Sequence, residues 1–181
     1  MSAQGNPVTT PNTNEPFVRQ GGIITRPWLL FIQGLANKVN SGVASYQSGK
    51  WTPGFAGDST LGTPTYVVQV GTWEKFGRLV VARFAVEISA VGGMAGNLLV
   101  GPLPFFSNPT ITNPGSGMLA FMKGITLSAS YTQVGFEIGS NYNYAEVVES
   151  GSAQISKFLP ISGVASSSAI YGTLLYAVPG N

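Results

Sequence analysis

The sequence lacks cysteine and histidine altogether, and it has few charged residues. Without cysteine the chain has no disulfide, no thiol nucleophile and no cysteine ligand for zinc. Without histidine, Ser-His-Asp and Cys-His catalytic arrangements are impossible, as is any metal site built on histidine. The 9 Lys+Arg and 7 Asp+Glu residues make up 9% of the 181 residues, whereas an ordinary soluble domain has about 25%. The absence of cysteine and histidine thus excludes the commonest kinds of enzyme site.

The low charge also narrows the range of partners. The formal net charge is +2, and no cluster of Lys and Arg exists, so we expect no nucleic-acid partner. The longest apolar run covers residues 28–32, far short of the ~20 residues of a membrane span, so we expect no membrane insertion. The first five residues are polar and uncharged, and no secretory signal is expected. Hydrophobic residues make up 44% of the chain, which is enough for a core.

The N-terminal quarter predicts an extended arm followed by a helix. Residues 1–22 are rich in Asn, Thr, Pro and Gly, which is typical of an irregular segment. A helix is expected over about 26–40, within an anchoring segment 23–41, because Thr25 can cap it and Pro27 fits its first turn. This helix carries an apolar stripe, which packs either on its own domain or on another chain. The spacing of the apolar residues along the stripe favours self-association. The residues that we expect to attach or oligomerise the chain are Ile23, Ile24, Trp28, Phe31, Ile32, Leu35 and Val39.

The remainder of the chain predicts an all-β domain. Residues 42–65 are expected to form a linker, and alternation of apolar and polar residues begins at 66. It is clearest over 79–88, 131–138 and 170–178, where the even positions are apolar. Shorter strands are expected over 66–70 and 72–76, with a turn at Gly71 between them. Eight or nine short strands separated by turn signals favour a jelly-roll-like β-sandwich over 66–181.

Acidic residues offer little for catalysis or metal binding. Glu146 and Glu149 are close in sequence, but a separation of three on a strand points them to opposite faces. We therefore expect both to be solvent-facing charges and expect no catalytic residue, although a loop could bring them together as a glycosidase pair. Asp58 and Asn97 are isolated oxygen ligands without calcium-loop spacing, so no metal and no cofactor are expected.

One loop has side chains suited to recognition. Residues 140–144 combine aromatic and amide groups, which suit both sugars and protein surfaces. An ordinary turn with its rings packed onto the sandwich is the simpler alternative. Tyr131 begins the preceding strand and is expected to join the same surface. The candidate receptor-binding residues are therefore Tyr131, Asn141, Tyr142, Asn143 and Tyr144.

Four segments together resemble the fibre proteins of bacteriophage virion surfaces. They are GTWEKFGRLV at 71–80, GNLLVGPLPF at 96–105, IYGTLLY at 170–176 and GIITRPWLLF at 22–31. The resemblance covers roughly residues 20–40 and 64–178. It implies a jelly-roll-like domain assembled as a homotrimer on the virus particle, with the N-terminal segment bound to other virion proteins.

Three functions remain open on these grounds. The first is a non-enzymatic trimeric short fibre, on the head or tail of the virion, that adheres to a host-surface glycan or protein through many weak contacts. The alternative is a capsid decoration or small jelly-roll coat protein with no receptor role. The third is a polysaccharide-cleaving fibre. All three place the chain in the virion, and the first places it at the virion surface.

Overall fold

The computed structural model describes residues 16–19, 21–44 and 46–180, and the chain divides into two compact units, Met1–Tyr46 and Gln47–Asn181. Most of the arm expected over 1–22 lies outside the described residues. Each unit is considered by itself below.

The first unit contains a short hairpin and one helix. β1 (Val18–Arg19) pairs antiparallel with β2 (Ile23–Ile24), and the chain turns between them at Gly21 and Gly22, which have φ of 105° and 78°. Glycine reaches such angles without strain, so the two glycines permit this tight turn. Ile23 and Ile24 therefore lie in a strand before the helix, so the segment expected over 23–41 to anchor the chain is not helical from its start.

The helix α1 (Arg26–Ala44) begins where the sequence predicts and ends four residues later than expected. Asn40, Ser41 and Gly42 do not stop it, because each costs a helix only about 1 kcal/mol or less relative to alanine. Just before the helix, the Thr25 hydroxyl donates a hydrogen bond to the Pro16 carbonyl at 2.8 Å, and Thr25 N–H donates to Phe17 O at 3.0 Å. These bonds fix the hairpin to the start of the helix.

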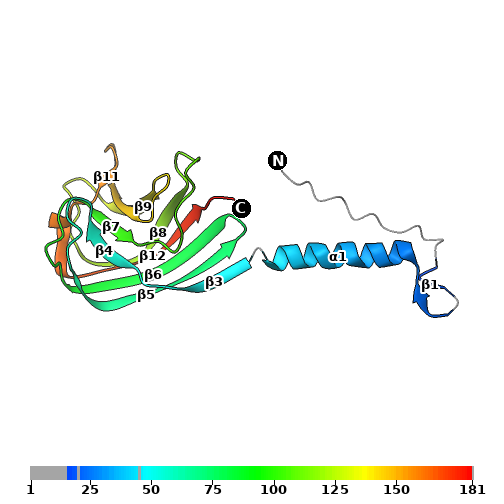
Figure 1. Cartoon of the computed structure of the whole chain (residues 1–181). Coiled ribbons are helices and arrows are strands. Elements are labelled where there is room, and N and C mark those ends of the chain that lie inside the picture. The colour runs from blue at the N-terminus through cyan, green and yellow to red at the C-terminus, as the bar shows by residue number, and fades with distance from the viewer. Residues whose placement is uncertain (1–15, 20, 45, 181) are drawn as a thin grey trace. The chain divides into compact units, whose positions relative to one another are not determined.

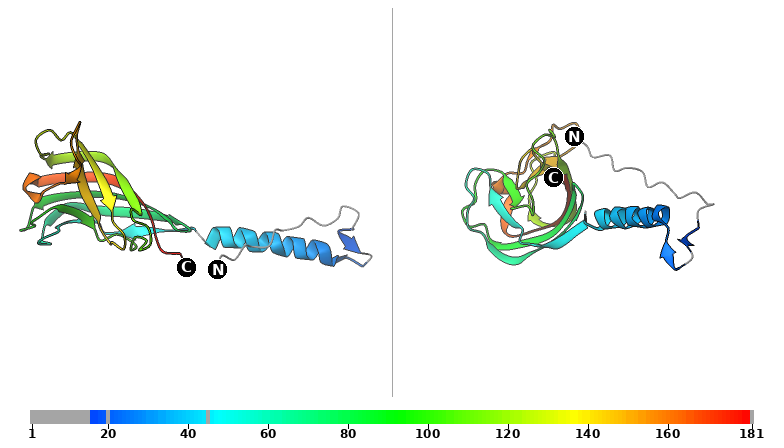
Figure 2. Two further views of the ribbon diagram at one scale, coloured as in Figure 1. Left: turned by 90° about the horizontal axis from the view of Figure 1, so that it is seen from above. Right: turned by 45° about the vertical axis from the view of Figure 1, so that its right-hand side comes forward.

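The second unit is a single curled sheet with ten strands, drawn in Figures 1 and 2. The path of neighbouring strands is β3-β5-β6-β12-β8-β9-β10-β7-β4, with β11 paired to β10. A 3₁₀ turn at Ile161–Gly163 precedes the last strand. The strands are β3 (Tyr46–Trp51), β4 (Gly54–Gly57), β5 (Thr65–Phe76), β6 (Leu79–Ala90), β7 (Leu98–Gly101), β8 (Gly115–Ile125), β9 (Gln133–Ile138), β10 (Ala145–Ser150), β11 (Lys157–Phe158) and β12 (Val164–Ala177).

The core lies inside the curl, between long strands on one side and short strands on the other. The even positions of β6 are buried from Val80 to Ile88, as the alternation predicts. Across the core, the rings of Phe84 in β6 and Phe136 in β9 meet edge to face at 5.5 Å. The prediction of an all-β fold is confirmed, and the one apolar cluster draws on both halves of the sheet.

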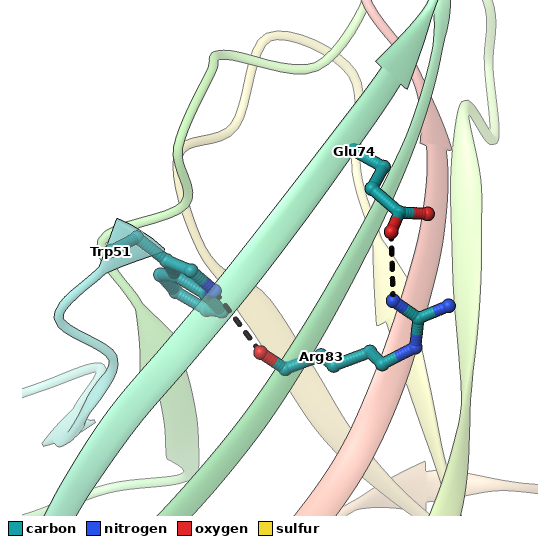
Figure 3. A network of polar contacts seen from close by, with 3 residues as sticks. All are labelled: Trp51, Glu74 and Arg83. Atoms are coloured by element: carbon teal, nitrogen blue, oxygen red, sulfur yellow. Dashed lines mark hydrogen bonds and ion pairs between the residues drawn. The ribbon is translucent and has the colours of Figure 1, made fainter. Parts of the chain in front are cut away.

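Two strands form within the segment 42–65 that was expected to be a linker. β3 and β4 lie within this range and form the two ends of the sheet path. Gly71 is also not a turn, because β5 continues through it. A Cβ at position 71 would stand 2.3 Å from Trp51 Nε1, so the glycine leaves room for the indole. Trp51 Nε1 donates a hydrogen bond to Arg83 O at 3.2 Å, and Figure 3 shows this contact beside the Glu74–Arg83 ion pair.

Candidate functional site

The loop between β9 and β10 carries a stacked pair of aromatic rings. Tyr142 and Tyr144 lie 4.6 Å apart between ring centroids, with 28° between their planes. The loop is held from below by the buried Ser107, whose hydroxyl accepts from Tyr142 N and whose N–H donates to Tyr142 O, each at 2.8 Å. Leu103 N–H also donates to Asn143 O. These hydrogen bonds fix the backbone of the loop at Tyr142 and Asn143.

A pocket of about 370 Å³ opens beside this loop. Gly54 of β4 and Gly101 of β7 are register partners, and the absence of their side chains deepens the surface there. No residue that lines the pocket, all of them in the described part of the chain, carries a charge. The lining residues are Thr52, Gly54, Phe55, Ala56, Leu61, Gly62, Pro64, Tyr66, Gln69, Leu99, Gly101, Pro102, Asn143 and Tyr144.

Tyr66 builds one wall of the pocket from the opposite end of the sheet. Its hydroxyl accepts a hydrogen bond from Phe55 N at 3.1 Å and donates one to Phe55 O at 3.2 Å. Burial raises the pKa of Tyr66, against the lowering effect of the bond from Phe55. The hydroxyl is therefore neutral at physiological pH, and it ties β5 to the edge of β4.

Carboxylates stand close to the pocket without lining it. Glu146 of β10 is the register partner of both Glu137 and Leu99, and Leu99 lines the pocket. Burial raises the pKa of Glu146, and the negative charges of Glu137 and Asp58 raise it further. The pKa of Tyr144 is raised by burial first, then by Tyr142, and also by the charges of Glu146 and Asp58. The charged groups that act on Tyr144 beside the pocket are therefore both carboxylates.

Asp58 and Asn97, which look isolated in the sequence, are in direct contact. Asp58 accepts hydrogen bonds from Asn97 N and Asn97 Nδ2, both at 2.8 Å, and from Ser59 Oγ at 3.1 Å. The bond from the Asn97 backbone is the main reason why the pKa of Asp58 is lowered. Protein donors thus occupy both carboxylate oxygens. Among the described residues, no group of three or more Asp or Glu side chains is placed to hold a metal ion.

Tyr131 does not join the loop at 140–144. It precedes β9, whereas the loop follows β9, and a strand of six residues spans about 20 Å. The Tyr131 hydroxyl donates to Ile155 O at 2.8 Å, and the Lys157 ammonium lies 4.8 Å from the centre of its ring. The expectation of one shared surface is therefore wrong for Tyr131. Asn143 and Tyr144 line the pocket, Tyr142 stacks on Tyr144 without lining the pocket, and Asn141 is exposed in the turn.

Glu149 is fully buried, which corrects the expectation of a solvent-facing charge. It alternates with Ala145 and Val147 on the inner face of β10, while Glu146 faces outward. Ser128 N–H donates to Glu149 Oε2 at 2.9 Å, and Lys157 Nζ lies 3.4 Å from Oε1. Burial alone would raise the pKa of Glu149, but the bonds from Ser128 and the charge of Lys157 outweigh it, so the pKa is lowered. The carboxylate thus links the Ser128 backbone to the Lys157 ammonium.

The first unit carries a second candidate site, on the helix. Trp28 contacts Phe17 and Phe31 edge to face, with centroids 5.5 Å and 5.9 Å away. Most of the apolar side chains expected to attach or oligomerise the chain are exposed, as are their neighbours. The exposed ones are Ile23, Ile24, Leu29, Leu30, Ile32, Leu35 and Val39. In the described part of the chain, no helix has the length and apolar content needed to cross a membrane.

The outer face of the long strands is also apolar. Its charged groups pair with one another: Arg83 lies 3.4 Å from Glu74, and Lys123 lies 2.8 Å from Glu87. Between them the Phe121 and Tyr171 rings lie 5.0 Å apart. The large apolar side chains exposed on this face are Val70, Phe76, Leu79, Met118, Phe121 and Leu175.

Sequence reasoning found the aromatic loop but missed most of the pocket. Tyr66 and Gln69 come from β5, and Leu61 comes from a segment expected to be a linker. No local pattern marks these residues, because the pocket forms only when β4 folds back beside β5. The buried Glu149 had a signal, since Ala145 and Val147 share its strand face.

The fold is similar to part of a known phage protein. The crystal structure of the Dettilon tailspike protein superposes with a TM-score of 0.58 at 17% sequence identity, over 73% of this chain and 24% of that one. The chain therefore spans about a quarter of the length of that tailspike. No protein-family model matches the sequence, and no curated protein matches it. The likeness shows that the curled sheet is a fold also found in a bacteriophage tailspike.

Proposed function

We propose that the chain is a structural protein of a bacteriophage virion, a trimeric short fibre that projects from the particle and adheres to the host surface. The observation that carries this proposal is the exposed apolar helix, in a chain whose sheet shares its fold with a tailspike. The helix attaches the chain to its copies and to the particle. The sheet unit presents the pocket and its loop to the host.

The helix chemistry supports association with further copies of the chain. Ile32, Leu35 and Val39 continue a stripe from Trp28 at spacings of four, three and four, which is the spacing of a helical seam. Ile32, Leu35 and Val39 are 40%, 43% and 62% exposed. Full burial of such a side chain from water is worth about 1.5–3 kcal/mol, and a partner that covers these partly exposed side chains gains about half of that from each.

The outer face of the sheet supports the same conclusion. On the part of this face formed by the long strands β5, β6, β8 and β12, Met118 is 74% exposed and Leu175 is 47% exposed, and the four charged side chains there form two ion pairs. A neutral apolar face does not select a strongly charged partner, and it suits contact with an identical face. Exposed patches of this kind mark interaction sites in soluble proteins.

Point substitutions on the helix test the assembly. Ile32→Asp and Leu35→Asp place charges in the seam, whereas the matched control Gln33→Asp adds the same charge at an exposed polar position. Light scattering on a sizing column is expected to give three times 18.9 kDa for the native chain and for Gln33→Asp, and a lower mass for the seam variants. A native chain that is monomeric at micromolar concentration would contradict the trimer.

Particle incorporation tests the attachment. Phage particles assembled with Ile32→Asp in place of the native chain are expected to lack the protein, while the Gln33→Asp chain is incorporated. Incorporation of the seam variant at the native level would show that attachment lies elsewhere.

We also propose that the fibre acts without cleaving its receptor. Glu146 and Glu149 lie on opposite faces of β10, and Glu149 is engaged by Ser128 and Lys157, so these two do not form a glycosidase pair. Incubation with host-surface polysaccharide is expected to release no reducing ends. Release that disappears in Glu146→Gln would favour a cleaving fibre instead.

A further inference from the structure

We propose that the pocket between β4, β5 and the loop at 140–144 is a binding site for an uncharged saccharide. This inference rests on the proposed function, because it names the ligand class through which the fibre would adhere. The pocket volume of about 370 Å³ lies within the range of about 300–1,000 Å³ usual for small-ligand sites.

The first step of the argument is the aromatic wall. Tyr144 lines the pocket, and Tyr142, which is outside the lining, stacks against it with 4.6 Å between the ring centroids. The stacked partner limits rotation of the Tyr144 ring, so a ligand orders this ring at little entropic cost. Sugar rings present C–H groups that pack on such a face, as other apolar groups do on aromatic rings.

The second step is the set of polar groups around that wall. Asn143 and Gln69 carry amides, Thr52 carries a hydroxyl, and all three line the pocket, whereas the hydroxyl of Tyr66 already donates to Phe55 O. Each amide both donates and accepts hydrogen bonds, which matches adjacent sugar hydroxyls that do the same. The Asn143 backbone is held by Leu103 N–H, so the amide projects from a fixed point.

The third step concerns charge and selects against acidic sugars. The lining contains no cation to pair with a carboxylate or sulfate. Glu146 and Asp58 stand near enough to Tyr144 that their charges raise its pKa. An anionic saccharide would therefore be desolvated beside like charges with no compensating partner, which is costly. An uncharged hexose or N-acetylhexosamine meets no such penalty.

The proposal is tested with the full chain and defined probes. Titrations by saturation-transfer NMR use the methyl glycosides of glucose, galactose, mannose and N-acetylglucosamine, with glucuronate and N-acetylneuraminate as acidic counterparts. At least one neutral glycoside is expected to bind in the millimolar range, where single weak sites lie, and both acidic sugars are expected not to bind.

Variants then locate the binding. Tyr144→Ala is expected to weaken binding about tenfold or more, equivalent to about 1.4 kcal/mol. Asn143→Ala and Gln69→Ala, which remove no ring, are each expected to weaken it as well. Tyr131→Ala is the matched control, because it removes a tyrosine beyond the other end of β9. Circular dichroism of each variant confirms that the sheet is intact.

The outcomes separate this inference from the proposed function. If none of the neutral glycosides binds, or if Tyr144→Ala, Asn143→Ala and Gln69→Ala all bind like the native chain, the saccharide site is refuted. The trimer and its attachment to the particle would not be affected by that result, because the helix variants test them separately. Preference for an acidic sugar would also overturn the inference, because the charge argument predicts the opposite.

Discussion

Trp73 lies where a side chain at Gly49 would stand, since a Cβ at position 49 would come within 2.8 Å of the Trp73 indole. Trp51 stands in the same relation to Gly71. Gly49 and Trp51 lie in β3, while Gly71 and Trp73 lie in β5. Each tryptophan thus packs over a glycine of the neighbouring strand. We call this reciprocal packing of Trp51 on Gly71 and of Trp73 on Gly49 the exchange.

This exchange makes Gly71 sensitive to the smallest substitution. Gly71→Ala is expected to displace Trp51, break its bond to Arg83 O and lower the free energy of unfolding by about 1–3 kcal/mol, as overpacking does. Urea unfolding followed by tryptophan fluorescence measures the effect. Gly135→Ala is the control, because a Cβ there meets nothing within 4 Å. Equal stability of the two variants would refute the exchange.

Tyr66→Phe is expected to destabilise the second unit and to alter the pocket. The change removes the hydroxyl that pairs with both Phe55 N and Phe55 O. An unpaired buried backbone group costs about 1–3 kcal/mol, so thermal unfolding should show a loss of this order. Tyr171→Phe, on the outer face of β12, should cost less. A smaller loss for Tyr66→Phe than for Tyr171→Phe would show that the hydroxyl bonds contribute little.

Glu149 and Glu146 are expected to contribute opposite pH dependences of stability. The pKa of Glu149 is lowered in the folded state, so its stabilisation is present above the ordinary glutamate value of 4.5 and is lost as pH falls through the folded pKa. The pKa of Glu146 is raised, so the folded state gains stability from its protonated form, and that gain is lost as pH rises above 4.5.

Unfolding free energies measured between acid and neutral pH test both signs. Glu149→Gln should lose the native chain's rise in stability with pH in the region below 4.5. Glu146→Gln should relieve a penalty that the native chain carries at neutral pH. Parallel pH curves for the native chain and both variants would contradict the assignment of these two environments.

Glu146→Gln also tests the charge at the pocket. Removing this charge is expected to weaken the discrimination against glucuronate, with little change in the binding of a neutral glycoside. The physical reason is that Glu146 raises the pKa of Tyr144 from outside the lining, so it acts through its field and not by contact. A parallel titration of native chain and variant with both sugars measures it. Unchanged discrimination would place the selectivity elsewhere.

The sequence predicts the long strands well, because burial of one face gives a period of two. Val80, Phe84 and Ile88 follow this pattern, and all are buried. Prediction from alternation fails for β3 and β4, because their glycine-containing segments do not alternate. These two segments become strands only by pairing with the strands beside them. Gly71 lies inside a strand and makes room for Trp51, which is twenty positions away in the chain. No local sequence pattern therefore distinguishes this glycine from one in a turn.

The candidate pocket was also predicted only in part, because local sequence patterns reveal residues of one turn but not contacts between distant strands. Tyr144 and Asn143 lie in one turn and could be identified by their chemistry. Their association with Tyr66 and Gln69 depends on the curl of the whole sheet. Tyr131 precedes β9 and the loop follows it, so chain order alone already indicates that they lie at opposite ends of this strand.

The bond between Tyr66 and Phe55 also bears on how the sheet resists aggregation. β4 is an end strand, and every second N–H of such a strand points away from its neighbour. Along residues 53–57, all of them described, Pro53 has no N–H, Phe55 N–H is held by Tyr66 and Gly57 N–H donates to Leu61 O at 3.4 Å. This edge offers no free donor to an incoming strand. An incoming strand therefore finds no donor along these residues, which disfavours fibril-like growth by strand addition at β4.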